Sequence, residues 1–182
     1  MKIKFLATLF AALMLAGFGV NAQVKIGYTN IDFILTNIPD SKVIQEKLAT
    51  EKAQYDKLLQ EKIATFQKDY EDYQKNAATM SPVIRQDKEK TLQTAQEGIQ
   101  TFQKNSENAL QSKQQDLLAP VMDKIQGAID EVAKANAYTH VFNSDAGYGT
   151  TPVILVAPES DNITSLVFKQ LGVEEPVVPA EN

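Results

Sequence analysis

The sequence predicts an α+β protein in which a long antiparallel helical hairpin, a coiled-coil arm, is inserted into a small β body. Residues 41–136 favour helix throughout, apart from one break around 76–82. Apolar residues recur along both halves of this stretch at steps of three and four, the pattern of a coiled-coil seam. Short runs typical of β-strands lie before and after it, so the hairpin leaves the body and returns to it.

The first 22 residues have the pattern of a signal peptide. Lys2 and Lys4 precede an apolar run, and Val20-Asn21-Ala22 suits cleavage before Gln23. The less favoured alternative is a retained membrane anchor, because the run is shorter than the roughly 20 residues that span a bilayer. The absence of cysteine excludes a lipid-modified N-terminal Cys, disulfides and thiol chemistry. We therefore expect an exported protein.

The segment before the arm combines a strand with a short helix. Residues 24–29 alternate apolar and polar side chains, which predicts a half-buried strand. Asn30 is a suitable N-cap for a helix over 31–35, and residues 37–40 break the chain. We expect Asp40 or Ser41 to cap the long helix that follows.

The arm is predicted as an outgoing helix over 41–79 and a return helix that begins after Ser81. Ser81 is a good N-cap, and Pro82 suits the first helical position, where no N–H is needed. A single register pairs Leu59 with Phe102 and Phe66 with Ala95, and it also serves both ends of the arm. Toward the tip it places Tyr73 opposite Lys88 and Ala77 opposite Ile84. Toward the base it places Leu48 opposite Lys113 and Glu51 opposite Leu110. At about 1.5 Å per residue the outgoing helix would reach about 58 Å.

Pro120 lies inside the return helix and must remove the hydrogen bond to the Asp116 carbonyl, which predicts a kink. Its register partner is residue 41, where the outgoing helix starts. We therefore expect Pro120 to act as a hinge at the base of the arm.

After the arm, the sequence predicts strands over 138–142 and 153–156, the latter more uniformly buried, and a short helix that ends at Leu171. Asp161 or Asn162 is expected to cap that helix and Gly172 to stop it. Residues 23–40 and 118–172 would form the body, 41–117 the arm, and 173–182 a disordered acidic tail.

A body of this size offers a marginal core for one chain, and its sheet would have open edges. Both problems disappear if several chains pool their strands, so we expect a homo-oligomer, whose number these grounds leave open. The apolar body residues expected to carry the oligomer contact are Ile26, Tyr28, Val141, Phe142, Ile154 and Val156.

The charge balance argues against nucleic acid. Removal of Lys2 and Lys4 takes the formal net charge from −5 to −7, and residues 41–136 carry 14 basic and 15 acidic side chains. Binding to nucleic acid needs clustered Lys and Arg. The chain also offers no polybasic patch for anionic lipid.

The sequence predicts no catalytic residue, no cofactor and no metal site. His140 is the single histidine and lies in a predicted strand, so with no cysteine a zinc site is not expected. There is no nucleotide-binding loop, and Gly147-Tyr148-Gly149 is more typical of a turn.

The aromatic and tip residues of the arm are the candidate binding surface. Phe66 and Phe102 have seam partners and can simply close the hairpin, whereas Tyr73, Met80 and Val83 are less required by the register. Exposed Tyr and Met side chains give broad, adaptable contact, which suits a client without fixed structure. The candidate set is Tyr55, Phe66, Tyr70, Tyr73, Met80, Val83, Ile84 and Phe102. The alternative is a structural coiled-coil protein of the envelope that binds a specific folded partner.

The order of motifs around the hairpin resembles the Skp/OmpH family of periplasmic chaperones. The resemblance rests on Lys25-Ile26-Gly27-Tyr28-Thr29-Asn30 with Ile31-Asp32, on Tyr138-Thr139-His140-Val141-Phe142-Asn143, and on Asp161-Asn162-Ile163-Thr164 leading to Val167-Phe168-Lys169-Gln170-Leu171.

The resemblance covers the mature chain except for the acidic tail. It implies a periplasmic trimer with pooled strands, whose arms enclose unfolded outer-membrane proteins and prevent their aggregation without ATP. The best-known members are strongly basic, whereas this chain is acidic. In the family, contact with the membrane or with lipopolysaccharide is attributed to basic patches. The acidic charge of this chain therefore puts that contact in doubt here.

Overall fold

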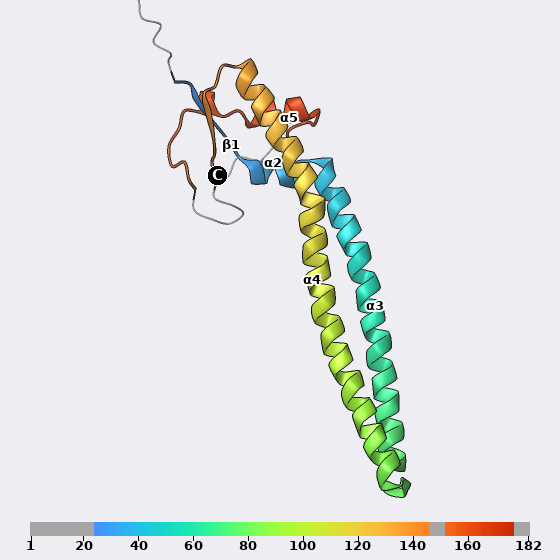
Figure 1. Ribbon diagram of the computed structural model, residues 1–182. Coiled ribbons are helices and arrows are strands. Elements are labelled where there is room, and N and C mark those ends of the chain that lie inside the picture. The colour runs from blue at the N-terminus through green and yellow to red at the C-terminus, as the bar shows by residue number, and fades with distance from the viewer. Residues whose placement is uncertain (1–23, 146–151, 177–182) are drawn as a thin grey trace, which may run out of the picture.

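The computed structural model describes residues 24–145 and 152–176, and it shows a small body from which one long helical hairpin projects (Figure 1). The elements in chain order are β1 (Ile26–Thr29), α2 (Ile31–Asn37), α3 (Pro39–Asn76), the 3-10 turn η1 (Ala77–Thr79), α4 (Pro82–Ala135), β2 (His140–Asn143), the 3-10 turn η2 (Glu159–Asp161) and α5 (Thr164–Leu171). The predicted signal peptide and the end of the predicted tail lie outside the described residues. None of the described helices combines the length and apolarity needed to cross a bilayer.

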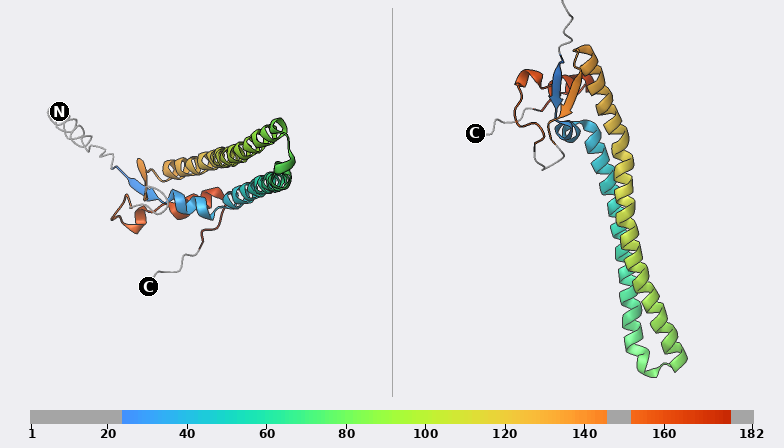
Figure 2. Two further views of the ribbon diagram at one scale, coloured as in Figure 1. Left: turned by 90° about the horizontal axis from the view of Figure 1, so that it is seen from below. Right: turned by 60° about the vertical axis from the view of Figure 1, so that its left-hand side comes forward.

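β1 and β2 form a two-stranded parallel sheet, and the strands lie side by side in Figure 2. Ile26 is opposite His140, and Tyr28 is opposite Phe142. Parallel strands need a crossover connection. Here the whole arm lies in that connection, so the hairpin interrupts the body in sequence while the body stays continuous in space.

The predicted third strand over 153–156 is wrong for the single chain that the structure describes. Val153 and Ile154 each donate a backbone hydrogen bond to the Ser144 carbonyl, and the neighbouring bridge joins Asp145 to Pro152. Leu155 is 80% exposed and Val156 is 93% exposed. A run rich in β-branched residues forms a strand only where another strand pairs with it, and none of the described residues forms a strand beside this run.

The predicted side-chain cap at the start of α3 is also wrong. α3 begins at Pro39, with Ile38 at the N-cap and no side-chain cap. Asp40 pairs instead with Lys124 at 3.1 Å, and Ser41 donates to the Leu35 carbonyl. Ile38 itself is buried, so packing rather than capping sets the start of the helix.

At the other ends the predicted signals are confirmed. The Ser81 side chain accepts a hydrogen bond from the Ile84 N–H, and Pro82 is the first residue of α4. Gly172 ends α5 with φ 70°, the left-handed conformation that glycine tolerates best. At the start of α5, Ile163 takes the N-cap position that was predicted for Asp161 or Asn162. The Asn162 side chain still accepts a hydrogen bond from the N–H of Thr164, the first residue of the helix, at 3.1 Å.

The core lies where α2, α5 and the last turns of α4 meet. Phe33 and Phe168 pack edge to face, with ring centroids 5.8 Å apart. The buried hydroxyls of Thr29 and Thr164 lie 3.0 Å apart and tie β1 to α5. The buried apolar side chains of this core are Ile34, Ile38, Ile44, Val121, Ile125, Ala128, Ile129, Val132, Ile163, Val167 and Phe168.

α4 passes through Pro120 without a break and serves both parts of the molecule. Pro120 is exposed, and Val121 directly after it is the first core residue of the helix. Its position at the base of the arm therefore agrees with the predicted register. Its action as a hinge stays a prediction.

Candidate binding surface of the helical arm

The two arm helices pack along a seam that is mostly half-buried. Leu59 and Phe102 line one groove between the helices, and Phe66, Ala95 and Ile99 line another. These groups agree with the predicted register in the middle of the arm. Between Ile44 and Val121, Leu92 is the only buried residue, and it is 9% exposed. Two helices alone cannot cover an apolar stripe completely, so the arm keeps apolar surface in contact with water.

Nearer the base, Tyr55 contacts both its own helix and the opposite one. The Tyr55 hydroxyl donates to Glu51 on its own helix at 2.9 Å, and its ring meets Phe102 edge to face at 6.3 Å. A groove of about 590 Å³ runs along this part of the arm, with charged side chains beside apolar ones. Its lining residues are Val43, Glu46, Lys47, Thr50, Glu51, Gln54, Tyr55, Lys113 and Leu117.

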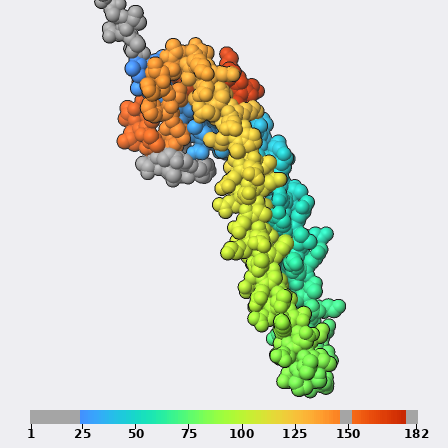
Figure 3. Space-filling model, in the orientation of Figure 1, coloured from blue at the N-terminus to red at the C-terminus, as the bar shows by residue number. Residues whose placement is uncertain are grey.

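Farther along the arm, aromatic rings lie at the surface. Phe66 is half-buried and stacks with Tyr70 at a centroid distance of 6.1 Å. Tyr70 stays 44% exposed, and Leu58 on the same helix is 45% exposed. In the space-filling view the two helices lie in contact along their length (Figure 3). The arm therefore offers shallow apolar surface instead of a closed pocket.

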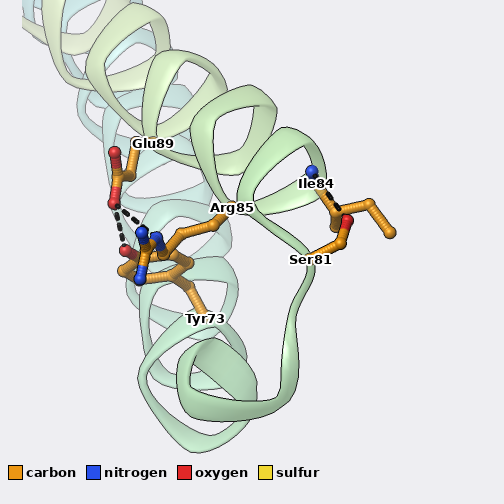
Figure 4. Close-up of polar contacts among 5 residues, drawn as sticks. All are labelled: Tyr73, Ser81, Ile84, Arg85 and Glu89. Atoms are coloured by element: carbon orange, nitrogen blue, oxygen red, sulfur yellow. Dashed lines mark hydrogen bonds and ion pairs between the residues drawn. The ribbon is translucent and has the colours of Figure 1, made fainter.

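At the tip, Tyr73 has a partner that the register did not predict. Its hydroxyl donates to Glu89 on α4 at 2.6 Å, whereas the sequence placed Lys88 opposite it. Arg85 Nε lies 4.0 Å from the same Glu89 oxygen (Figure 4). The hydrogen bond to Glu89, with smaller contributions from burial and from the Glu89 charge, raises the pKa of Tyr73 above its usual 10.0.

The other tip residues differ in how far they are covered. Met80 is half-buried, and Val83 is 77% exposed. Ile84 is 53% exposed, and its side chain points away from the neighbouring helix in Figure 4. Ile84 therefore does not close the seam against Ala77, as the predicted register required. It belongs to the exposed surface of the tip with Val83.

The body has an apolar face of its own. Side chains paired across parallel strands share a face of the sheet, so Tyr28 and Phe142 lie on the same side as Ile26. Ile26 and Phe142 are 48% and 49% exposed, while Val141 packs against the core. Ile154 is half-buried and Val156 almost fully exposed. The apolar sequence of 153–156 predicted a buried strand, and only the fold shows that most of this segment is exposed.

Within the described residues, no three His, Asp or Glu side chains are grouped so that they could hold a metal ion. His140 lies on the exposed face of the sheet, where its ring stacks with Phe142 at 6.4 Å.

The molecule is a helical-arm protein: a narrow hairpin with an interrupted apolar surface projects from a small body of helices and strands. The chain belongs to the OmpH-like outer membrane protein family, whose model matches residues 25–171. The resemblance seen in the sequence is therefore confirmed.

A similar solved structure is a crystal structure of an OmpH-like protein from Caulobacter crescentus, itself provisionally described as an outer membrane chaperone. It has a TM-score of 0.70 and 14% sequence identity, and the match covers 87% of this chain and 91% of that one. At this identity the likeness shows a shared fold. No curated protein matches the sequence.

Proposed function

We propose that this protein is a periplasmic chaperone that holds unfolded outer-membrane proteins between helical arms, without ATP, and prevents their aggregation. The observation that carries the proposal is the exposure of apolar side chains along an arm that has no closed pocket: Leu58, Tyr70, Val83 and Ile84 are 45%, 44%, 77% and 53% exposed. Family membership supports the chaperone class. Many weak contacts on several arms would add up to useful affinity through multivalency.

The proposal includes export and assembly. A signal peptide cleaved after Ala22 would deliver the chain to the periplasm. The exposed apolar face of the sheet and the unpaired segment 153–156 would then be covered by other copies, as in the trimer that the family resemblance implies. An assembled body would direct several arms around one client.

The alternative function is a structural coiled-coil protein that binds one folded partner. Such a spacer should have a uniformly apolar seam and a polar tip. The half-buried middle of the seam and the exposed Val83 and Ile84 favour the holding function instead.

The test is a binding assay with an outer-membrane β-barrel protein, either diluted from urea or already refolded. We expect the unfolded form to bind and the refolded form not to bind. Replacement of Val83 and Ile84 by Ser should weaken binding by up to about 2–4 kcal/mol per arm, because only the exposed part of each side chain can be newly buried. Leu166→Ser on α5 is the matched control, since Leu166 is 39% exposed but lies in the body.

Salt separates apolar holding from capture by charge. Because the arm is nearly neutral, raising the ionic strength from low to physiological should change binding little. Equal binding of the folded and unfolded barrel, or loss of binding with salt alone, would contradict the proposal.

A further inference from the structure

The arm is tied across its two helices by polar contacts at its two ends. At the base, Lys124 Nζ lies 3.1 Å from Asp40 Oδ2. At the tip, the Tyr73 hydroxyl donates to Glu89 Oε1 at 2.6 Å, and Arg85 Nε approaches the same oxygen to 4.0 Å (Figure 4). We call Tyr73, Arg85 and Glu89 the tip latch.

Little else holds the tip closed. Leu92 is the last buried side chain toward the tip, and every residue from 81 to 90 is exposed. On the other side of the turn, Tyr73, Ala77 and Met80 are only half-buried. The other tip hydrogen bonds that involve a side chain stay within one helix or the turn: Asn76 to Asp72, Thr79 to Asn76, Ile84 to Ser81, and Thr91 to Asp87.

We propose that the tip latch keeps the outer end of the hairpin closed in the free protein, and that an unfolded client binds the opened tip. The inference rests on the proposed holding function and concerns its regulation. Opening separates the helices beyond Leu92 and frees the covered parts of Tyr73, Ala77, Met80 and Leu92. Aromatic rings and a Met side chain suit an unfolded partner, because they adapt to many apolar surfaces.

The latch is weak enough to open reversibly. All three of its side chains are partly or largely exposed to water, where a single polar contact adds little stability. The open tip is then a minor state in equilibrium with the closed one. A ligand that binds only a minor state shows an apparent affinity reduced by the fraction of protein in that state. Weakening the latch should therefore strengthen client binding.

The decisive variant is Tyr73→Phe in the full-length mature chain, because it removes the hydroxyl and keeps the ring. Thr91→Val is its control, because it also removes a hydroxyl hydrogen bond in the tip region. The Thr91 hydroxyl donates at 2.9 Å to the Asp87 carbonyl on its own helix, so this bond does not join the two helices. Glu89→Gln tests the other side of the latch, and Glu97→Gln is its control, because Glu97 accepts from Gln93 on the same helix at 3.0 Å.

Two quantities are measured on each variant. Hydrogen exchange of residues 73–91 reports tip opening, with residues 59–66 as the internal reference. Fluorescence anisotropy with a labelled outer-membrane β-barrel diluted from urea reports affinity. We expect Tyr73→Phe to speed tip exchange about 3- to 10-fold, the effect of losing one hydrogen bond of modest strength. Binding should tighten by the same factor.

Glu89→Gln should act in the same direction, and both control variants should match wild type. Unchanged tip exchange in Tyr73→Phe would overturn the latch. Faster exchange with unchanged or weaker binding would overturn the inference that clients bind the opened tip. If the wild-type protein does not bind the unfolded barrel at all, both the proposed holding function and the inference that clients bind the opened tip are wrong. Hydrogen exchange then still shows whether the tip latch keeps the hairpin closed.

Discussion

Gly27 shows how a single residue can be fixed by close packing. A Cβ at this position would meet the Tyr138 ring at 2.9 Å and the Asp161 carbonyl oxygen at 3.3 Å. Tyr138 cannot easily move, because Lys25 Nζ lies 4.0 Å from the centroid of its ring and also donates to the Asn136 carbonyl at 2.8 Å. The absent side chain therefore lets β1 approach Tyr138, between α4 and β2, and the end of η2.

We predict that Gly27→Ala lowers the free energy of unfolding by about 1–3 kcal/mol, the usual cost of overpacking. Gly98→Ala should do the opposite. Nothing lies within 4 Å of a Cβ at Gly98, and alanine is favoured over glycine inside a helix by about 0.5–1 kcal/mol. Urea unfolding followed by circular dichroism, at one protein concentration, measures both. Equal stability of the two variants would contradict the packing assigned to Gly27.

At the scale of elements, the two arm helices are not equally well joined along their length. Leu59 shares a groove with Phe102, and Phe66 shares one with Ala95 and Ile99. Closer to the base, the register predicted from the sequence places Leu48 opposite Lys113 and Glu51 opposite Leu110. Helices held mainly by packing of an apolar face open locally where that face is interrupted. The arm should therefore be less stable close to its base than in its middle.

We predict faster hydrogen exchange at residues 48–55 and 106–113 than at 59–70, measured in the wild-type protein by mass spectrometry. The tip beyond Leu92 should form a second region of fast exchange. Uniform protection along both helices would contradict the assignment of a loose seam near the base.

At the scale of the whole molecule, the described body leaves apolar surface uncovered. Ile26, Phe142, Leu155 and Val156 are 48%, 49%, 80% and 93% exposed. β1 and β2 form a sheet of only two strands, which is marginal as an independent unit. Copies that pool strands would cover both the apolar face and the free strand edges.

We predict that replacing Leu155 and Val156 together by Asp lowers the oligomer mass measured by light scattering. Both side chains are largely exposed within one chain, so the helix content seen by circular dichroism should not change. Replacement of Val83 and Ile84 together by Asp is the control, because it introduces the same two negative charges on exposed residues of the arm tip. An unchanged mass in the double variant would exclude 153–156 from the interface.

The sequence by itself determined the arm, because its signals are local. The three- and four-residue periodicity, the Ser81-Pro82 start and the Gly172 stop act on their own helices, and one register follows from matching the two stripes. The short helix α2, its Asn30 cap and the family resemblance were likewise predictable from residues close in sequence.

Only the tertiary structure decided the rest. Whether β1 and β2 pair in parallel, whether 153–156 finds a neighbour, and whether Tyr73 bonds to Lys88 or Glu89 depend on segments that are distant in sequence. Ile38 starts α3 without a side-chain cap because it is buried in the core, and no local propensity contains that information. Strand pairing and side-chain contacts across the hairpin depend on position in space, which the folded chain as a whole sets.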